Sequence, residues 1–129
     1  MTTKNSRSLS LEEISKDSNL VRVKELLVRD FSPLKMYLFG SRASGQFRPD
    51  SDYDVVLVVK ARLGTRLENM QKARLLLFDN ELLGDVFVYT QEEFDSWKTE
   101  FSSIPEIATT QGVEIPLGNF TDPLARRAS

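Results

Sequence analysis

The segment Tyr53–Val59, with the sequence YDVVLVV, constrains the fold of this chain more than any other. After Asp54 its apolar residues follow one another without a polar interruption, which is typical of a strand buried on both faces. A strand with one exposed face would alternate apolar and polar residues instead. The sequence therefore predicts an α/β (α+β) domain in which helices cover a small mixed sheet of three to four strands.

The segments around this strand supply the remaining elements. Further strands are expected at Leu34–Phe39 and Asp85–Tyr89, with a weak strand near 113–115. Long helices are predicted over 20–31, after a soft break at 16–19, and over 66–80, where Leu67, Met70, Arg74 and Leu77 recur at helical spacing. Capping boxes are formed by Ser10 with Glu13 and by Thr90 with Glu93, and the second predicts a helix that runs to about Phe101. Short helices are expected after Ser41 and near 104–111.

Length and composition indicate one domain. The chain has 129 residues, of which 40% are apolar and 28% charged, and we expect a disordered arm over 1–8, a domain over 9–117 and a loose tail over 118–129. The N-terminus has no apolar signal core and no run is long enough to span a membrane, so the predicted location is the cytoplasm. The net charge of −2 lacks the basic excess of a general nucleic-acid-binding protein, so no stable nucleic-acid binding is expected.

The chain contains neither histidine nor cysteine. The commonest general base near neutral pH, thiolate nucleophiles and the usual zinc ligands are therefore excluded. Any catalysis must use carboxylates, hydroxyls, lysine, arginine or a bound metal ion.

Two carboxylates, Asp52 and Asp54, stand where the buried strand begins. On an extended chain, residues two apart point to the same side, so the two negative charges repel each other. A divalent cation would relieve this repulsion, and hard oxygen ligands suit Mg²⁺ or Mn²⁺. The alternative is a solvated turn, in which aspartate is common.

A Gly-Ser-Arg sequence, Gly40, Ser41 and Arg42, follows the preceding strand. A strand that ends in Gly-Ser and opens a helix presents backbone amides and a hydroxyl suited to phosphate, and the arginine adds a planar fork of donors. A plain strand-to-helix turn would have the same sequence. Phosphate donors followed closely by a pair of carboxylates are the combination that a metal-bound nucleoside triphosphate requires.

The sequence GSRASGQFRPDSDYDVVLV resembles the signature of the nucleotidyltransferase superfamily related to DNA polymerase beta. It is most similar to the minimal nucleotidyltransferases (MNT proteins) of HEPN–MNT toxin–antitoxin modules. Asp85, in LLGDVFVYTQEEF, stands where that family has a third carboxylate, and the resemblance covers about residues 9–116. The residues in register with the family motif are Gly40, Ser41, Arg42, Ala43, Gly45, Ser51, Asp52 and Asp54.

The resemblance implies a function. Catalytic and metal-binding roles would fall to Asp52, Asp54 and Asp85, with two Mg²⁺ or Mn²⁺ ions, and nucleotide-binding roles would fall to the Gly-Ser-Arg turn. The implied reaction moves AMP from ATP to an acceptor hydroxyl and releases pyrophosphate. By the same resemblance the acceptor would be a tyrosine of a HEPN toxin, and the chain would act as its antitoxin.

Several alternatives stay open at this stage. The chain could be an antitoxin that neutralises its partner by contact alone, or a nucleotidyltransferase for a small molecule. Ser44 stands where the family often has arginine, and Arg48 is a candidate replacement. Asp85 could instead cap the turn at Leu83–Gly84. The sequence fixes neither the nucleotide nor the oligomeric state.

Overall fold

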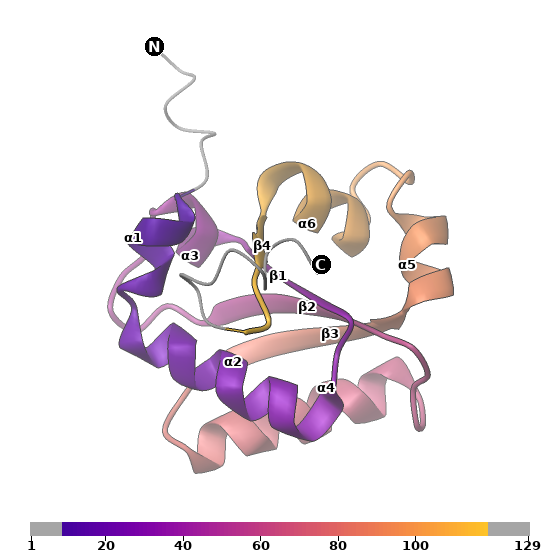
Figure 1. Cartoon of the computed structure of the whole chain (residues 1–129), viewed down its shortest axis with the longest axis horizontal. Helices are drawn as coiled ribbons and strands as arrows, with labels where there is room; N and C mark the ends of the chain where they lie inside the picture. The colour runs from indigo at the N-terminus through magenta and orange to yellow at the C-terminus, as the bar shows by residue number, and fades with distance from the viewer. Residues whose placement is uncertain (1–8, 119–129) are drawn as a thin grey trace.

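The computed structural model describes residues 9–118, so the predicted arm and all of the predicted tail except Gly118 lie outside the described residues. The described elements are α1 Leu11–Ser15, α2 Ser18–Phe31, β1 Lys35–Phe39, α3 Ser41–Ser44, β2 Tyr53–Val59, α4 Arg66–Asp79, β3 Gly84–Thr90, α5 Gln91–Trp97, α6 Ile104–Gln111 and β4 Val113–Ile115. The predicted α/β class is confirmed, and Figure 1 shows the arrangement of the elements.

The four strands form one mixed sheet in the order β3-β2-β1-β4. Strand β2 lies parallel to β3 and antiparallel to β1, and β4 is antiparallel to β1 on its other side. The two strands before and after α4 are therefore joined by a βαβ crossover, whereas β1 and β2 are joined through the short helix α3. This topology brings the end of β1 beside the beginning of β2 and β3.

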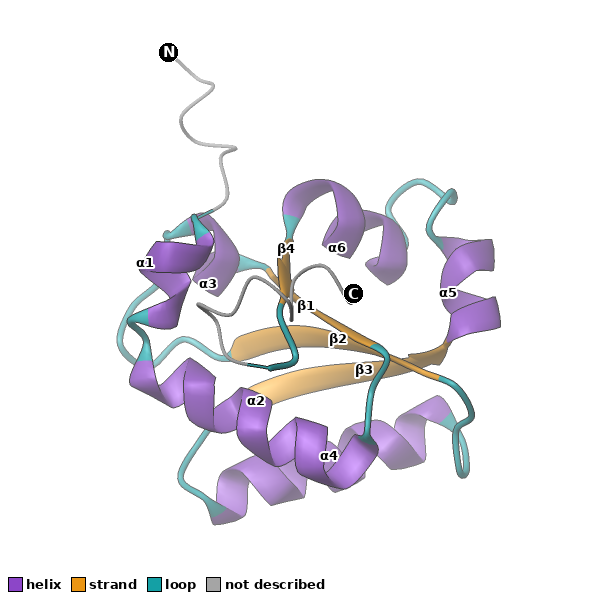
Figure 2. Ribbon diagram, viewed as in Figure 1, coloured by secondary structure: helices purple, strands orange, loops and turns teal. Residues whose placement is uncertain are grey.

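Helices cover both faces of the sheet, as Figure 2 shows. On one face Val55, Leu57 and Val59 pack in a cluster with apolar residues of α2 and α4. On the other face Val56 and Val58 pack in a cluster with residues of α5 and α6. The predicted burial of this strand on both faces is confirmed, because each of these five side chains is buried.

Side chains mark most helix boundaries. Both predicted capping boxes are present, and a third, Thr65 with Glu68, opens α4. The predicted soft break separates α1 from α2, where the Asp17 carboxylate accepts from the amides of Asn19 and Leu20. No helix of residues 9–118 is both long enough and apolar enough to cross a membrane.

Two helix predictions need correction. Helix α5 ends at Trp97 and does not reach Phe101, whose side chain is 90% exposed and therefore gains no core packing from a longer helix. Helix α4 is where it was predicted, but its buried residues are Asn69, Ala73 and Leu77, so Leu67 and Arg74 point outward. The spacing suggested the wrong face because α4 carries apolar residues on both sides.

Candidate functional site

Asp54 and Asp85 are neighbours across two parallel strands. Each is the second residue of its strand, β2 and β3, and the register pairs them directly. Adjacent strands lie about 4.8 Å apart, and register partners in parallel strands point to the same face. Here that is the face of Val56 and Phe87, which α5 and α6 cover. Asp52 lies two residues earlier in the chain, just before β2.

Gly40 lies directly against the Asp54 carboxylate. It follows β1, whose last residue, Phe39, is the register partner of Asp54. Its φ of 76° lies in the region that favours glycine, and a Cβ at this position would collide with the Asp54 carboxylate. The fold therefore brings the predicted phosphate turn and the predicted carboxylate pair together, although they are separated by a dozen residues.

The charges at this site are only partly compensated. Burial, followed by the charges of Asp85 and Asp52, raises the pKa of Asp54 to about 6. Like charges held this close favour either protonation of one carboxyl or a bound cation. Such perturbed groups in a cluster are typical of functional sites.

Arg74 supplies a positive charge that the sequence did not indicate. Its guanidinium reaches from α4 around the outer strand of the sheet and donates to Asp85 Oδ1 at 2.6 Å. The arginine side chain is 61% exposed, so this ion pair is largely solvated. Asp85 is thus held in place by a contact that an entering ligand can displace.

Arg42 belongs to α3, and its side chain packs against the loop that connects α3 to β2. Its side chain is 8% exposed and donates to the carbonyl oxygens of Pro49 and Ser51 at 3.0–3.2 Å. Its guanidinium stacks between the rings of Phe47 and Tyr53, at 4.4 Å from each centroid. These contacts support a role in shaping the loop that delivers Asp52. The phosphate contact predicted for Arg42 stays a prediction.

Ser41 and Ser44 lie in the same short helix. The Ser44 hydroxyl donates to the carbonyl of Ser41 at 3.2 Å, so it acts within the helix. The backbone amide of Arg48 donates to the Ser51 hydroxyl. This contact does not involve the Arg48 side chain and so does not connect that side chain to the site. The replacement role considered for Arg48 also stays a prediction.

The residues fit a divalent metal that binds together with its substrate. All the donors are carboxylate oxygens, which Mg²⁺ and Mn²⁺ prefer. Among residues 9–118 no group of three or more acidic side chains is already gathered around one point. This is compatible with Mg²⁺, which usually binds through one or two carboxylates plus substrate phosphates. Asp52 and Asp54 would be those carboxylates, with Asp85 joining once Arg74 releases it.

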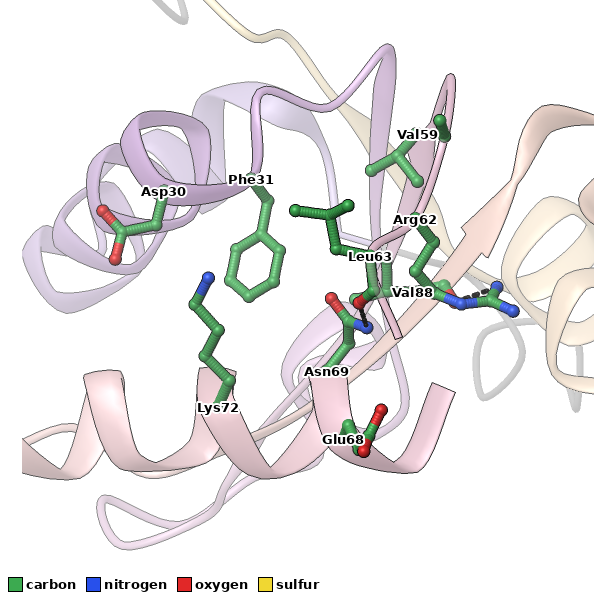
Figure 3. A pocket seen from close by; sticks show the side chains of 10 residues that line it. Asp30, Phe31, Val59, Arg62, Leu63, Glu68, Asn69, Lys72 and Val88 are labelled. Atoms are coloured by element: carbon green, nitrogen blue, oxygen red, sulfur yellow. Dashed lines mark hydrogen bonds between the residues drawn. The ribbon is translucent and has the colours of Figure 1, made fainter. Parts of the chain in front are cut away.

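Two of the pockets in residues 9–118 lie at opposite ends of the sheet. The larger, of about 200 Å³, lies beyond the carboxyl ends of β2 and β3, where Phe31 of α2 faces Asn69 and Lys72 of α4 (Figure 3). The smaller, of about 140 Å³, includes Asp52 and Arg74 and therefore belongs to the carboxylate end. The larger hollow lies away from the acidic residues.

The sequence profile of the nucleotidyltransferase domain family matches residues 20–109, a range that includes Gly40, Asp54 and Asp85. The chain belongs to the nucleotidyltransferase domain family. The predicted resemblance to nucleotidyltransferases is thereby confirmed.

Two solved structures are similar to this nucleotidyltransferase. A crystal structure of a protein from Sulfolobus solfataricus, provisionally named a nucleotidyltransferase, is 21% identical, with a TM-score of 0.48, covering 78% of this chain and 86% of that one. A toxin–antitoxin structure with AMP-PNP is 22% identical, with a TM-score of 0.44, covering 86% of this chain and 78% of that one. No protein of curated function matches the chain.

Proposed function

We propose that this nucleotidyltransferase transfers AMP from ATP to an acceptor hydroxyl, with Asp52, Asp54 and Asp85 as its catalytic residues. The observation that carries the proposal is the direct pairing of Asp54 with Asp85, with Gly40 packed against the same carboxylate. A purely structural turn does not require two half-buried carboxylates that repel each other, or a glycine whose missing Cβ makes room for one of them.

In the proposed reaction the acceptor oxygen attacks the α-phosphorus of ATP. A new P–O bond forms, the bond between the α-phosphorus and the bridging oxygen breaks, and pyrophosphate leaves with the electron pair. Asp85 receives the proton of the acceptor hydroxyl. When bound by the three carboxylates, two Mg²⁺ or Mn²⁺ ions would neutralise the phosphate charge. In this scheme Gly40 and Ser41 bind the β- and γ-phosphates on the other side of Asp54.

The acceptor we propose is a tyrosine of a HEPN-type toxin, so that the chain acts as an antitoxin in the cytoplasm. This part rests on the resemblance of residues 9–116 to MNT proteins. The modest negative net charge further supports a protein acceptor over a nucleic acid.

The test uses two forms of labelled ATP with Mg²⁺ and a HEPN-type toxin as the candidate acceptor. AMP transfer predicts that label from [α-³²P]ATP becomes covalently attached to the toxin and that label from [γ-³²P]ATP does not. Transfer of the γ-label would identify a kinase instead. Neutralisation of the toxin without incorporation of either label would favour an antitoxin that acts by binding alone. As a control for the acceptor, each candidate tyrosine of the toxin is replaced by phenylalanine, which should abolish labelling at the acceptor position.

A further inference from the structure

We propose that the acceptor side chain enters through the smaller pocket, between the last turns of α4 and the turn before β3. The same geometry assigns the exposed apolar residues of α4 as the docking surface for the protein that carries this side chain. The inference rests on the proposed transfer reaction and specifies where the acceptor binds. The pocket residues that carry it are Asp52, Arg74, Leu75, Phe78 and Leu83.

The order of groups along the sheet gives the pocket its role. Gly40 lies at the β1 side of Asp54, and Asp85 lies at its β3 side. Beyond Asp85 comes Arg74, which donates to that carboxylate and lines the pocket. In phosphoryl transfer the attacking and leaving oxygens lie roughly in line, on opposite sides of the phosphorus. A pyrophosphate that leaves on the Gly40 side therefore requires an acceptor that arrives from the pocket side.

The size of the pocket favours a single side chain. Its volume is about 140 Å³, whereas pockets for drug-sized ligands have about 300 Å³ or more. A whole nucleoside would not be enclosed here. One aromatic ring can be surrounded by Leu75, Phe78 and Leu83, with its hydroxyl at the end formed by Asp52 and Arg74. A phenol has this combination of an apolar body and a polar tip.

The outer face of α4 extends the pocket into a docking surface. Leu67, Leu75 and Phe78 are 61%, 63% and 65% exposed, although Ala73 and Leu77 already anchor the helix to the core. Leu75 and Phe78 are three residues apart and therefore adjacent on the helix. In Figure 1 no other described element covers the side of α4 that faces away from the sheet. Leu75 and Phe78 line the pocket at the carboxylate end, whereas Leu67 lies in the first turn of α4, toward the other end of the sheet, so these residues extend along the helix. Exposed apolar residues that form a contiguous patch are typical of protein-binding surfaces.

The occupant is thus a protein that presents a tyrosine flanked by apolar side chains. A nucleobase would be the competing occupant of the pocket, but it would not account for Leu67, which lies further along the helix.

The first experiment measures binding without requiring catalysis. Leucine methyl groups of the full chain are isotopically labelled and observed by NMR during titration with millimolar N-acetyl-tyrosine amide, and separately with adenosine. We expect the methyl signals of Leu75, Leu82 and Leu83 to shift with the tyrosine probe, while the Leu63 methyls, 92% exposed and lining the pocket at the other end, do not. Shifts at these methyls with adenosine alone, or no shifts with either probe, would overturn the proposal.

The second experiment separates acceptor binding from nucleotide binding. Leu75→Ser and Phe78→Ser are compared with Leu63→Ser, which changes an exposed apolar residue outside the site. We expect the first two to lower kcat/KM for AMP transfer to N-acetyl-tyrosine amide at least about tenfold, with the Kd for Mg·ATP unchanged. Loss of Mg·ATP affinity would identify a nucleobase pocket, and unchanged transfer would show that the pocket is not used; both contradict the proposal. A wild-type chain that shows methyl shifts but no transfer would refute the proposed reaction and leave the pocket assignment standing.

Discussion

The two ends of strand β2 differ in how their charged side chains are compensated. At its beginning Asp54 is paired with Asp85 and follows Asp52 in the chain, and the pKa of Asp54 is raised by burial and by the charges of the other two carboxylates. At its far end Arg62 binds both carboxylate oxygens of Glu93, and its guanidinium also donates to the carbonyl oxygens of Gly64 and Val88. The hydrogen bond from Arg62 is the main reason that the pKa of Glu93 is lowered.

This contrast supports our proposal that the active site lies at the beginning of β2. The far end holds the larger pocket and lies at the carboxyl ends of two parallel strands, where ligands usually bind in α/β sheets. Its polar groups are nevertheless satisfied, since the Asn69 amide also donates to the carbonyls of Leu63 and Thr65. The carboxylate end has repelling negative charges that a cationic ligand would stabilise. We therefore propose the active site at this end, although the larger pocket lies at the other end.

The strongest test of the contrast is catalytic. Asp52→Ala and Asp54→Ala are each expected to lower kcat for AMP transfer by at least about 100-fold, because the charges that develop on the phosphates lose their stabilisation. Glu93→Gln, at the paired end, should change kcat by less than about twofold. Activity is measured with [α-³²P]ATP, and circular dichroism verifies that each variant is folded. Retained transfer in either aspartate variant would refute the assignment of this end as the active site.

The change in Tm on nucleotide binding should show at which end of β2 the nucleotide binds. At a ligand concentration 100 times Kd, binding to the native state alone adds about 2.7 kcal/mol to the free energy of unfolding. ATP with Mg²⁺ or Mn²⁺ is therefore expected to raise the Tm of the wild type, but not that of the Asp52→Ala/Asp54→Ala double variant. Lys72→Ala, which alters the larger pocket, should keep the wild-type shift. Equal shifts in wild type and double variant would place the nucleotide elsewhere.

Removal of a partner at the paired end should lower stability without affecting function. Glu93→Ala removes the ion-pair partner of Arg62 and the capping box of α5, in which the Glu93 carboxylate accepts from the Thr90 amide. We expect a loss of about 1–2 kcal/mol in the free energy of unfolding, measured by urea denaturation. Glu93→Gln, which retains an acceptor for the Thr90 amide, should lose less. A variant that loses nucleotide binding along with stability would contradict the division between the two ends.

Local sequence patterns predicted much of this architecture. The uninterrupted apolar run of β2, the capping boxes and the Gly-Ser and Asp-x-Asp spacings each depend on residues that are close in the chain. They suffice to indicate a two-sided sheet and a site at the beginning of β2. The direct pairing of Asp54 with Asp85 depends on the register of β3, which only the complete fold determines.

Two kinds of feature could not be read from the sequence: contacts between residues far apart in the chain, and the buried face of a helix whose apolar residues lie on both sides. Leu67 and Arg74 seemed to belong to the buried face of α4, because apolar residues on both sides of the helix leave its periodicity undecided. The ion pair from Arg74 to Asp85 exists only because α4 packs along the outer strand of the sheet. The burial of Arg42 likewise depends on Phe47 and Tyr53 closing around it from later in the chain.

The smallest expected effect concerns pH, and it has opposite signs at the two ends. Asp54 has a raised pKa when folded, so its ionisation destabilises the metal-free protein, and this penalty grows as pH rises from 3.8 to about 6. The full shift would correspond to about 3 kcal/mol, and solvent screening of a half-buried carboxyl reduces this to about 1 kcal/mol. With EDTA present, Asp54→Asn should therefore be more stable than the wild type at pH 7 and equal to it near pH 3.8.

Glu93 provides the matched control, because its pKa is lowered when folded. Its contribution to stability is fully present above pH 4.5 and is lost as pH falls through the lowered pKa. Glu93→Gln should thus be less stable than the wild type at pH 7, and the difference should shrink in acid. Urea denaturation of both variants from pH 3.5 to 7.5 measures the two trends together. If Asp54→Asn also lost stability at neutral pH, the carboxylate end would not carry the repulsion inferred from its geometry.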